Sequence, residues 1–491
     1  MRKSGVLMPV SSLPSKYGIG TFGKAAYEFV DQLRKGGQSL WQILPLGPTS
    51  YGDSPYQSFS TFAGNPYFID LEILVQEGLL TEKECDACDF GGNPEYVDYG
   101  CIYEARFDLL RKAFKRFALE KEEGYASFIQ ENGFWLEDYA LFMAVKNGFD
   151  GVSFSEWDED IKRREAKAMT RYTSEYADEI RFYEFLQYEF SKQWSALKAY
   201  ANKEGISIVG DIPIYVAFDS SDTWANPELF QFDEDLKPIG VAGCPPDAFS
   251  ATGQLWGNPL YNWSYHKKTN YEWWMKRFKH CFELYDVVRI DHFRGFDEYY
   301  AIPFGNPTAE FGQWEKGPGY ELFAVMKKQL GKKRVIAEDL GFLTDSVIKL
   351  VKKTGFPGMK ILQFAFDSRE ESDYLPHNYD KNSIVYTGTH DNDTTLGWWS
   401  TFARKDRKFA KKYLNVKTDK EINWVFIRAC MSSVSDTAII PMQDYLGLGS
   451  EARINTPSTL GENWKWRMTE GAFTEEIAQR MYDLTKLFYR L

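Results

Sequence analysis

Short apolar runs recur along the whole chain, and each is closed or followed by polar residues, glycine or proline. Their length of four to six residues and their content of Val, Ile and Leu predict buried strands. Amphipathic stretches between them, such as residues 25–34, predict helices. The predicted strands are residues 6–10, 40–44, 206–211, 286–291, 334–338, 359–364, 384–387 and 437–441.

This alternation of strands and helices indicates parallel βα units and the α/β class. Eight strands favour a (β/α)8 TIM barrel, and a doubly wound open sheet is the alternative. About 160 residues separate the second and third strands, far more than one crossover helix needs. We expect one catalytic barrel over residues 1–491 with large, mainly helical insertions after strands 2 and 3. These are a helical subdomain over about 81–203 and an insertion over about 213–285, whose Gly-, Pro- and Asn-rich part at 240–262 forms a loop covering the active-site cleft.

The composition narrows the functional classes. The chain has 491 residues, of which 26% are charged, and a net charge of −12 at pH 7 without a basic block. Nucleic-acid binding needs clustered Lys and Arg side chains, so we expect no nucleic-acid partner. No stretch approaches the ~20 apolar residues of a membrane span, so we expect a cytoplasmic protein without membrane contact. Aromatic residues make up 17% of the chain, and their flat amphipathic rings suit a sugar ligand.

Three features that could suggest a cofactor have simpler explanations. The six cysteines are too sparse for a disulfide framework, and Cys85 and Cys88 have no second pair at zinc-ribbon distance. Residues 18–23 match G-x-G-x-x-G, but seven residues separate them from the preceding strand and no acidic residue follows at the required distance. The five histidines form no ligand-spaced pair. We therefore expect reduced thiols, no metal and no cofactor.

Three acidic residues share one structural position, the carboxyl end of a predicted strand. They are Asp291, Glu338 and Asp391. In a (β/α)8 barrel the active site is built on that face, so residues far apart in sequence converge there. Arg289 has the same strand parity as Asp291, and a pair between them would keep the carboxylate ionised. Helix capping or an ion pair explains any one of these acids, but explains all three less readily.

Such a set suits glycoside chemistry, in which one carboxylate attacks the anomeric carbon and a second, protonated, carboxyl group donates to the leaving oxygen. Aromatic walls beside the carboxylates would bind the sugar rings. Candidates in or near strand-end loops are Trp41, Tyr51, Tyr56, Trp256, Trp398 and Trp399. For each of them alone, a place in the core is the simpler interpretation.

Nine motifs extend this picture over the whole chain. They are SPYQ (54–57), FAGNPY (62–67), GDIPIYV (210–216), PPDAFS (245–250), GQLWGNP (253–259), RIDHFRG (289–295), AEDLG (337–341), TGTHDNDT (387–394) and RINTP (453–457). With these motifs the chain resembles the amylomaltases, the 4-α-glucanotransferases of glycoside hydrolase family 77 in the α-amylase clan. Departures from the family pattern at Cys244, Tyr300 and Ile454 bear on acceptor preference.

The resemblance implies that Asp291 is the nucleophile, that Glu338 is the general acid and base, and that Asp391 binds the 2- and 3-hydroxyls of the reacting glucose. It implies structural support from Asp211. The substrate-binding residues that it implies are Arg289, His390, Asp247, Gln254, Trp256, Tyr56, Phe364 and Asn463. It implies neither a metal nor an organic cofactor.

The expected function is transfer of an α-1,4-glucan segment from one maltooligosaccharide or glucan to the 4-hydroxyl of another, or of glucose. The resemblance implies a retaining double displacement through a covalent glycosyl–Asp291 intermediate. One alternative is an α-glucan hydrolase of the same clan, in which water replaces the acceptor. Another is a non-catalytic glucan-binding protein, against which the intact set of three carboxylates argues.

Overall fold

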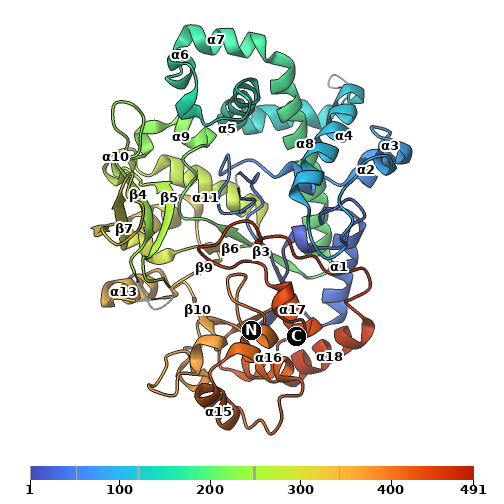
Figure 1. Cartoon of the computed structure of the whole chain (residues 1–491), viewed down its shortest axis with the longest axis vertical. Helices are drawn as coiled ribbons and strands as arrows, with labels where there is room; N and C mark the ends of the chain where they lie inside the picture. The colour runs from blue at the N-terminus through green and yellow to red at the C-terminus, as the bar shows by residue number, and fades with distance from the viewer. Residues whose placement is uncertain (1, 51, 119–121, 247–249, 342) are drawn as a thin grey trace.

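Eight parallel strands form a barrel at the centre of the computed structural model (Figure 1), which describes residues 2–50, 52–118, 122–246, 250–341 and 343–491. The strands are β1 (Lys3–Leu7), β2 (Leu40–Gln42), β3 (Ser207–Ile212), β6 (Val287–Ile290), β9 (Val335–Ala337), β10 (Gly358–Ile361), β11 (Ser383–Tyr386) and β12 (Thr437–Pro441). Their order is β10-β11-β12-β1-β2-β3-β6-β9. The Ala337 amide donates to the Pro357 carbonyl at 3.0 Å, next to the start of β10. All eight predicted strands lie in this sheet, so the open-sheet alternative is wrong.

Alternate residues of these strands fill the barrel. Leu7, Leu40, Val209, Val287 and Ile336 are among the buried side chains of one interior cluster, as expected for strands that are covered on both faces. Some predicted boundaries are displaced. The first strand ends at Leu7 and not at residue 10, because Pro9 has no amide hydrogen with which to continue the ladder.

Helices surround the barrel, as Figure 1 shows. Those that follow the strands or close the chain are α1 (Lys24–Lys35), α11 (Glu272–Leu284), α12 (Tyr320–Leu330), α13 (Asp345–Thr354), α14 (Thr395–Thr401), α15 (Arg404–Tyr413), α16 (Ile422–Ser432), α17 (Met442–Leu446) and α18 (Glu475–Leu487). In α1 the buried residues Ala26, Phe29, Val30 and Leu33 follow helical spacing and turn one face to the barrel. Burial of a large apolar side chain contributes about 1.5–3 kcal/mol, so this face holds α1 in place.

The segment between β2 and β3 is helical and lies in the upper part of Figure 1. It contains α2 (Leu71–Gln76), α3 (Glu82–Asp86), α4 (Tyr99–Arg116), α5 (Glu123–Gly148), α6 (Glu159–Lys162), α7 (Ala166–Glu175) and α8 (Ala177–Lys203). The long helices α5 and α8 pack together. Buried Phe182, Phe185, Leu186 and Phe190 follow helical spacing along α8, which explains why the segment folds against the rest of the chain.

A second, antiparallel sheet stands beside the barrel, and sequence analysis did not predict it. Its order is β5-β4-β7-β8, with β4 (Gly240–Cys244), β5 (Gln254–Pro259), β7 (Glu298–Pro303) and β8 (Gln313–Lys316). The segment after strand 3 contains the helices α9 (Ser221–Ala225) and α10 (Trp263–Lys268) as well as β4 and β5, so much of the expected loop at 240–262 is strand. A Cβ at Gly243 would lie 2.2 Å from the Gln254 carbonyl oxygen. Glycine at that position thus allows β4 and β5 to pair, and β4 pairs with β7 some 60 residues away.

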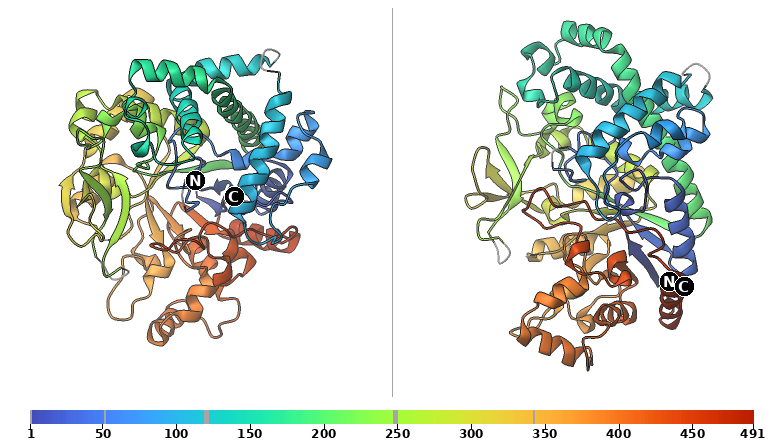
Figure 2. Two further views of the ribbon diagram at one scale, coloured as in Figure 1. Left: turned by 45° about the horizontal axis from the view of Figure 1, so that its top comes forward. Right: turned by 45° about the vertical axis from the view of Figure 1, so that its right-hand side comes forward.

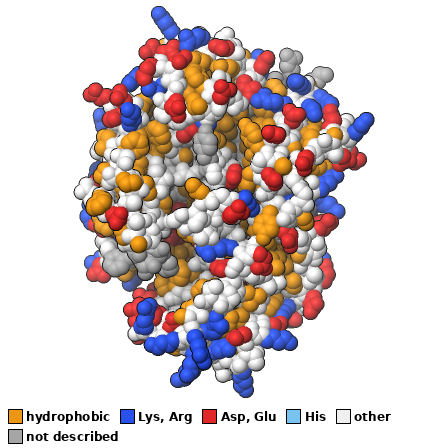
Figure 3. Space-filling model, in the orientation of Figure 1, with side chains coloured by type: hydrophobic (Ala, Val, Ile, Leu, Met, Phe, Trp, Pro, Cys, Tyr) orange, Lys and Arg blue, Asp and Glu red, His pale blue; other side chains and the backbone are white. Residues whose placement is uncertain are grey.

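The two chain ends lie side by side in both views of Figure 2, where the Arg490 guanidinium donates to the Lys3 carbonyl at 2.9 Å. On the face shown in Figure 3, Lys and Arg side chains are interspersed with Asp and Glu. Among the helices that the structure describes, none is both long and apolar enough to cross a bilayer. The six cysteines, all among the described residues, form no disulfide.

Candidate active site

Three of the predicted site residues end neighbouring strands of the barrel. Asp211 belongs to the end of β3, Asp291 follows β6 directly, and Glu338 follows β9 directly. β6 pairs with β3 on one side and with β9 on the other. The carboxyl ends of these strands therefore meet at one mouth of the barrel, as the strand pattern predicted.

One buried cation, Arg289, bonds to two of these carboxylates. The Arg289 guanidinium donates to Asp291 Oδ1 at 3.0 Å and also to Asp211 Oδ2. Arg289 and Asp211 are almost fully buried, whereas 27% of the Asp291 side chain is exposed. Burial raises the pKa of Asp211 to about 7, and Arg289 opposes that shift. Burial also raises the pKa of Asp291, while Arg289 favours its charged form.

The Glu338 carboxylate is held by backbone amides beside Asp291. The His292 amide donates to Glu338 Oε2 at 2.7 Å, and the Leu340 amide donates to Oε1 at 2.9 Å. Burial raises the pKa of Glu338 to about 7, aided by the neighbouring Asp291 charge and opposed by Arg289 and by these two amides. The site therefore contains one carboxylate paired with a cation and, beside it, a second whose pKa is raised.

The fourth carboxylate, Asp391, lies beyond the end of β11 and is held by residues from two loops. The Asn455 amide group donates to Asp391 Oδ1 at 2.6 Å, and His390 Nε2 lies 3.4 Å from Oδ2. The His390 ring stacks on Tyr56 with 5.2 Å between the ring centroids, and the Tyr56 hydroxyl donates to Asp211 at 2.9 Å. A series of side-chain contacts, from Asp211 through Tyr56 and His390 to Asp391, thus connects the end of β3 with the loop after β11.

An aromatic ring from the second sheet packs against the residue that follows Asp291. The Trp256 ring of β5 meets the His292 ring edge-on, with 4.8 Å between the centroids. The Trp256 indole N–H donates to Gln254 Oε1 at 3.1 Å. His292, directly after Asp291, has a left-handed backbone with φ of 48°, a conformation that bulky residues adopt rarely. The structure therefore brings Trp256, with Gln254 bonded to it, against the residue that follows Asp291.

Other predicted residues have different surroundings. The side-chain amide of Asn463 accepts from the Thr456 amide at 2.9 Å and donates to the Thr459 carbonyl at 2.9 Å. Phe364 follows β10 and contacts Tyr374 edge-on. Two aromatic candidates, Trp41 and Trp399, are only 0% and 5% exposed and belong to the core, while Trp398 is packed against it with Phe402 and Phe426. Asp247 and Tyr51 lie outside the described residues.

Within the described ranges, no group of three or more His, Cys, Asp or Glu residues is arranged to hold a metal ion. The Asp211 and Asp291 carboxylates are paired with Arg289. This arrangement of carboxyl groups can provide acid–base and nucleophilic chemistry.

Comparison with known proteins identifies the family. The family model described as 4-alpha-glucanotransferase matches residues 8–474. A 4-alpha-glucanotransferase from Clostridium butyricum is 53% identical over 98% of this chain and 100% of its own length. The chain belongs to the 4-alpha-glucanotransferase family. The expected fold and the expected activity of glucan transfer are thereby confirmed.

Further relatives support the same assignment. The 4-alpha-glucanotransferase of Thermus thermophilus is 45% identical over the whole of this chain and 99% of its own length. The solved structure of the amylomaltase from Streptococcus agalactiae, in complex with acarbose, superposes with a TM-score of 0.97 at 44% identity, and the match covers both chains completely. An amylomaltase structure from Corynebacterium glutamicum shares the fold with a TM-score of 0.80 at 18% identity.

Two residues of this 4-alpha-glucanotransferase family member take part in the site although sequence analysis gave them no role. Asn455 bonds to Asp391, and the Arg453 guanidinium donates to the Asp391 carbonyl at 2.7 Å. Both belong to the motif RINTP, which carried the resemblance but ends no strand. A search restricted to strand ends could not find them, because their proximity to Asp391 depends on how the loop after α17 folds back.

Proposed function

We propose that the chain performs its glucan transfer on α-1,4-linked maltooligosaccharides and glucans through a covalent intermediate on Asp291. The observation that supports this most directly is the difference between two adjacent carboxyl groups. Arg289 bonds to Asp291 and favours its charged form against the burial that raises its pKa, whereas Glu338 is held by backbone amides and has a pKa raised to about 7. Retaining glycosidases need such a pair, one group as nucleophile and the other as acid and then base.

In the first step, an Asp291 carboxylate oxygen bonds to the anomeric carbon while the glycosidic C–O bond breaks. The Glu338 proton goes to the leaving oxygen, so the donor's remaining segment departs as a neutral sugar. In the second step, Glu338 removes the proton of the acceptor's 4-hydroxyl, whose oxygen attacks the anomeric carbon and releases Asp291. Two inversions leave the α configuration unchanged.

The remaining residues position the sugar. We assign Asp391 to the 2- and 3-hydroxyls of the reacting glucose, because its carboxylate is 44% exposed and is fixed by Asn455 and His390. We assign Tyr56 to support of the site, because its ring stacks on His390 and its hydroxyl donates to Asp211. We assign Gln254 and Trp256 to donor and acceptor sugars, as part of an insertion that covers the cleft. We also propose that the helices of residues 81–203 form a separate subdomain.

The test is incubation with maltotriose alone, with products separated by chromatography. Transfer should yield glucose and a ladder of longer maltooligosaccharides while total reducing ends stay nearly constant. An increase of reducing ends in step with maltotriose consumption would establish hydrolysis instead, and unchanged maltotriose would favour a protein that only binds glucans.

Water exclusion leads to a prediction for Trp256. Water is present at about 55 M, so transfer requires an acceptor held in attack geometry and a site closed to solvent. Replacing Trp256 by Ala removes the wall beside His292 and should raise the ratio of hydrolysis to transfer at least about tenfold, measured as reducing ends per longer product. The neighbouring Leu255 is 41% exposed, and Leu255→Ala should leave the ratio unchanged. Equal ratios in both variants would contradict the assignment of Trp256.

The raised pKa of Glu338 predicts how kcat/KM for glucan transfer depends on pH. The first step needs Glu338 protonated, and because its pKa is raised to about 7, kcat/KM should fall about tenfold per pH unit above that value. On the acid side, activity should fall as Asp291 becomes protonated. Glu338→Gln should abolish the alkaline limb with α-maltosyl fluoride, whose leaving group needs no proton. An alkaline limb that persists in this variant would assign it to another group.

A further inference from the structure

A cavity lies at the opposite end of the barrel from the carboxylates. Its volume is about 480 Å³, and its walls include the beginnings of β2, β6 and β9 at Leu40, Val287 and Val335. Helix α12 and the turn after α13 complete it. This volume falls in the range of about 300–1,000 Å³ that is typical of small-molecule sites. Nothing in the proposed reaction uses this end of the barrel.

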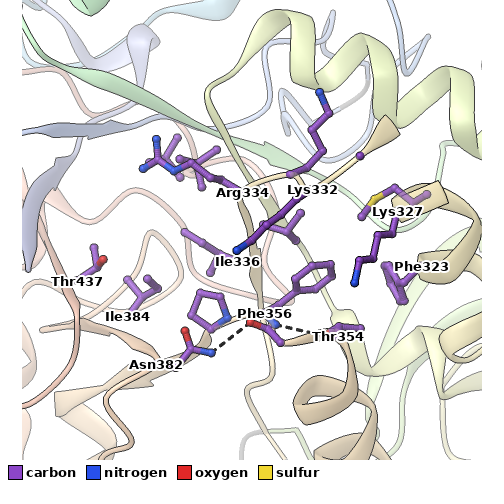
Figure 4. A pocket seen from close by; sticks show the side chains of 18 of the residues that line it. Phe323, Lys327, Lys332, Arg334, Ile336, Thr354, Phe356, Asn382, Ile384 and Thr437 are labelled. Carbon is purple, nitrogen blue, oxygen red and sulfur yellow. Dashed lines mark hydrogen bonds between the residues drawn. The ribbon is translucent and has the colours of Figure 1, made fainter. Parts of the chain in front are cut away.

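The deeper walls are apolar. Phe323 of α12, Phe356 after α13, and Ile336 and Ile384 of the strands line the space. Figure 4 shows the Phe323 and Phe356 rings on one side of the cavity and Ile336 and Ile384 on the other. Such walls suit the apolar body of a ligand, because burial removes its surface from water.

The mouth of this cavity, in contrast to its apolar walls, carries charged side chains that are all positive. Lys327, Lys332, Lys333 and Arg334 line it, and no Asp or Glu residue is among the lining side chains. This local excess stands out on a chain with a net charge of −12. In Figure 4 the Lys327 side chain reaches between Phe323 and Phe356.

The basic side chains of this mouth are not paired with carboxylates. In the described part of the chain, no ion pair involves Lys327, Lys332 or Arg334. The Asp286 charge acts on Arg334 and opposes the lowering of its pKa by burial, while Asp286 Oδ2 accepts from the Ile208 amide and from Asn202, each at 2.8 Å. Lys3 adds a further positive charge close to Arg334. Burial lowers the pKa of Lys3, and the Arg334 charge lowers it further.

We propose that this cavity binds a small organic anion with an apolar body. The carboxylate, sulfonate or phosphate group of the ligand lies among Lys327, Lys332 and Arg334, and its ring or alkyl part lies against Phe323 and Phe356. This site uses none of the residues to which the proposed catalytic mechanism assigns a role.

The probe is 8-anilinonaphthalene-1-sulfonate, an aromatic anion that fluoresces when it enters an apolar site. The full-length chain should enhance its fluorescence saturably. The triple variant Lys327→Gln, Lys332→Gln, Arg334→Gln should weaken its affinity at least tenfold, while affinity for the uncharged N-phenyl-1-naphthylamine changes less than twofold. The matched control Lys167→Gln removes one exposed charge on α7, far from the cavity, and should change neither affinity. Maltotriose transfer should persist in all variants, which separates this test from that of the proposed function.

The unchanged chain provides a second measurement if the triple variant does not fold. Octanoate should displace the probe at concentrations at least tenfold lower than octanol does, since only octanoate carries the charge. Saturating maltoheptaose should leave the probe bound. Unchanged probe affinity in the triple variant, equal potency of octanoate and octanol, or displacement by maltoheptaose would each overturn the proposal.

Discussion

Replacing Asp291 by Asn is expected to lower kcat for glucan transfer by about 10⁴-fold or more, because the reaction loses its nucleophile. Asn has the same shape, and its carbonyl oxygen still accepts from Arg289, so the fold should persist. Glu338→Gln should cause a loss of similar size with maltotriose, since the leaving oxygen then receives no proton. Initial rates of glucose release measure both effects.

The double variant and a control sharpen this prediction. Asp291 and Glu338 act as one unit, so losing both should be little worse than losing either. Asp286→Asn changes the residue just before β6, at the other end of the strand that Asp291 follows, and should leave kcat within about twofold of the original value. Rates near wild type in either single variant would refute the assigned roles.

Arg289→Met is expected to destabilise the protein and to inactivate it. The substitution leaves the carboxylates of Asp211 and Asp291 without their shared cation, and removal of one partner of a buried ion pair costs about 3–5 kcal/mol of unfolding free energy. The thermal unfolding midpoint should therefore fall by several degrees. An exposed pair offers the control: Lys276→Met removes the partner of Glu272 on α11 and should hardly change the midpoint.

A compensating change separates stability from catalysis. In the double variant Arg289→Met, Asp211→Asn, the more deeply buried charge is also removed, and part of the lost stability should return. Activity should not return, because Asp291 still lacks the guanidinium that favours its ionised form. Recovery of activity in the double variant would show that Arg289 serves only to neutralise Asp211.

Much of the candidate site could be predicted because strand ends are local features. Asp291 and Glu338 each follow an apolar run, and the barrel rule places such residues at one mouth. The pairing of Arg289 with Asp291 followed from strand parity, and the structure contains it at 3.0 Å. The role of Arg289 as a cation shared with Asp211 could not be foreseen, since it depends on the register between β3 and β6.

The second sheet shows where local patterns fail. The Gly-rich segment 240–262 has the composition of a loop, yet β4 and β5 form there because β4 pairs with β7 across about 60 residues. Pairing partners so distant leave no periodic signal in either segment. The Trp256–His292 contact depends on that pairing. The Asn455–Asp391 hydrogen bond likewise depends on the folding of another distant loop.

The sequence by itself determined the eight barrel strands, the mouth at which the carboxylates gather and, through its motifs, the family. These properties follow from hydrophobic periodicity and from residue types at strand ends, which are short-range. Only the tertiary structure decided the raised pKa of Glu338, the sharing of Arg289 by two carboxylates, and the cavity with a basic mouth at the far end of the barrel. The physical reason is that desolvation and charge coupling depend on which distant segments come together, and burial at that junction fixes the energy of each charge.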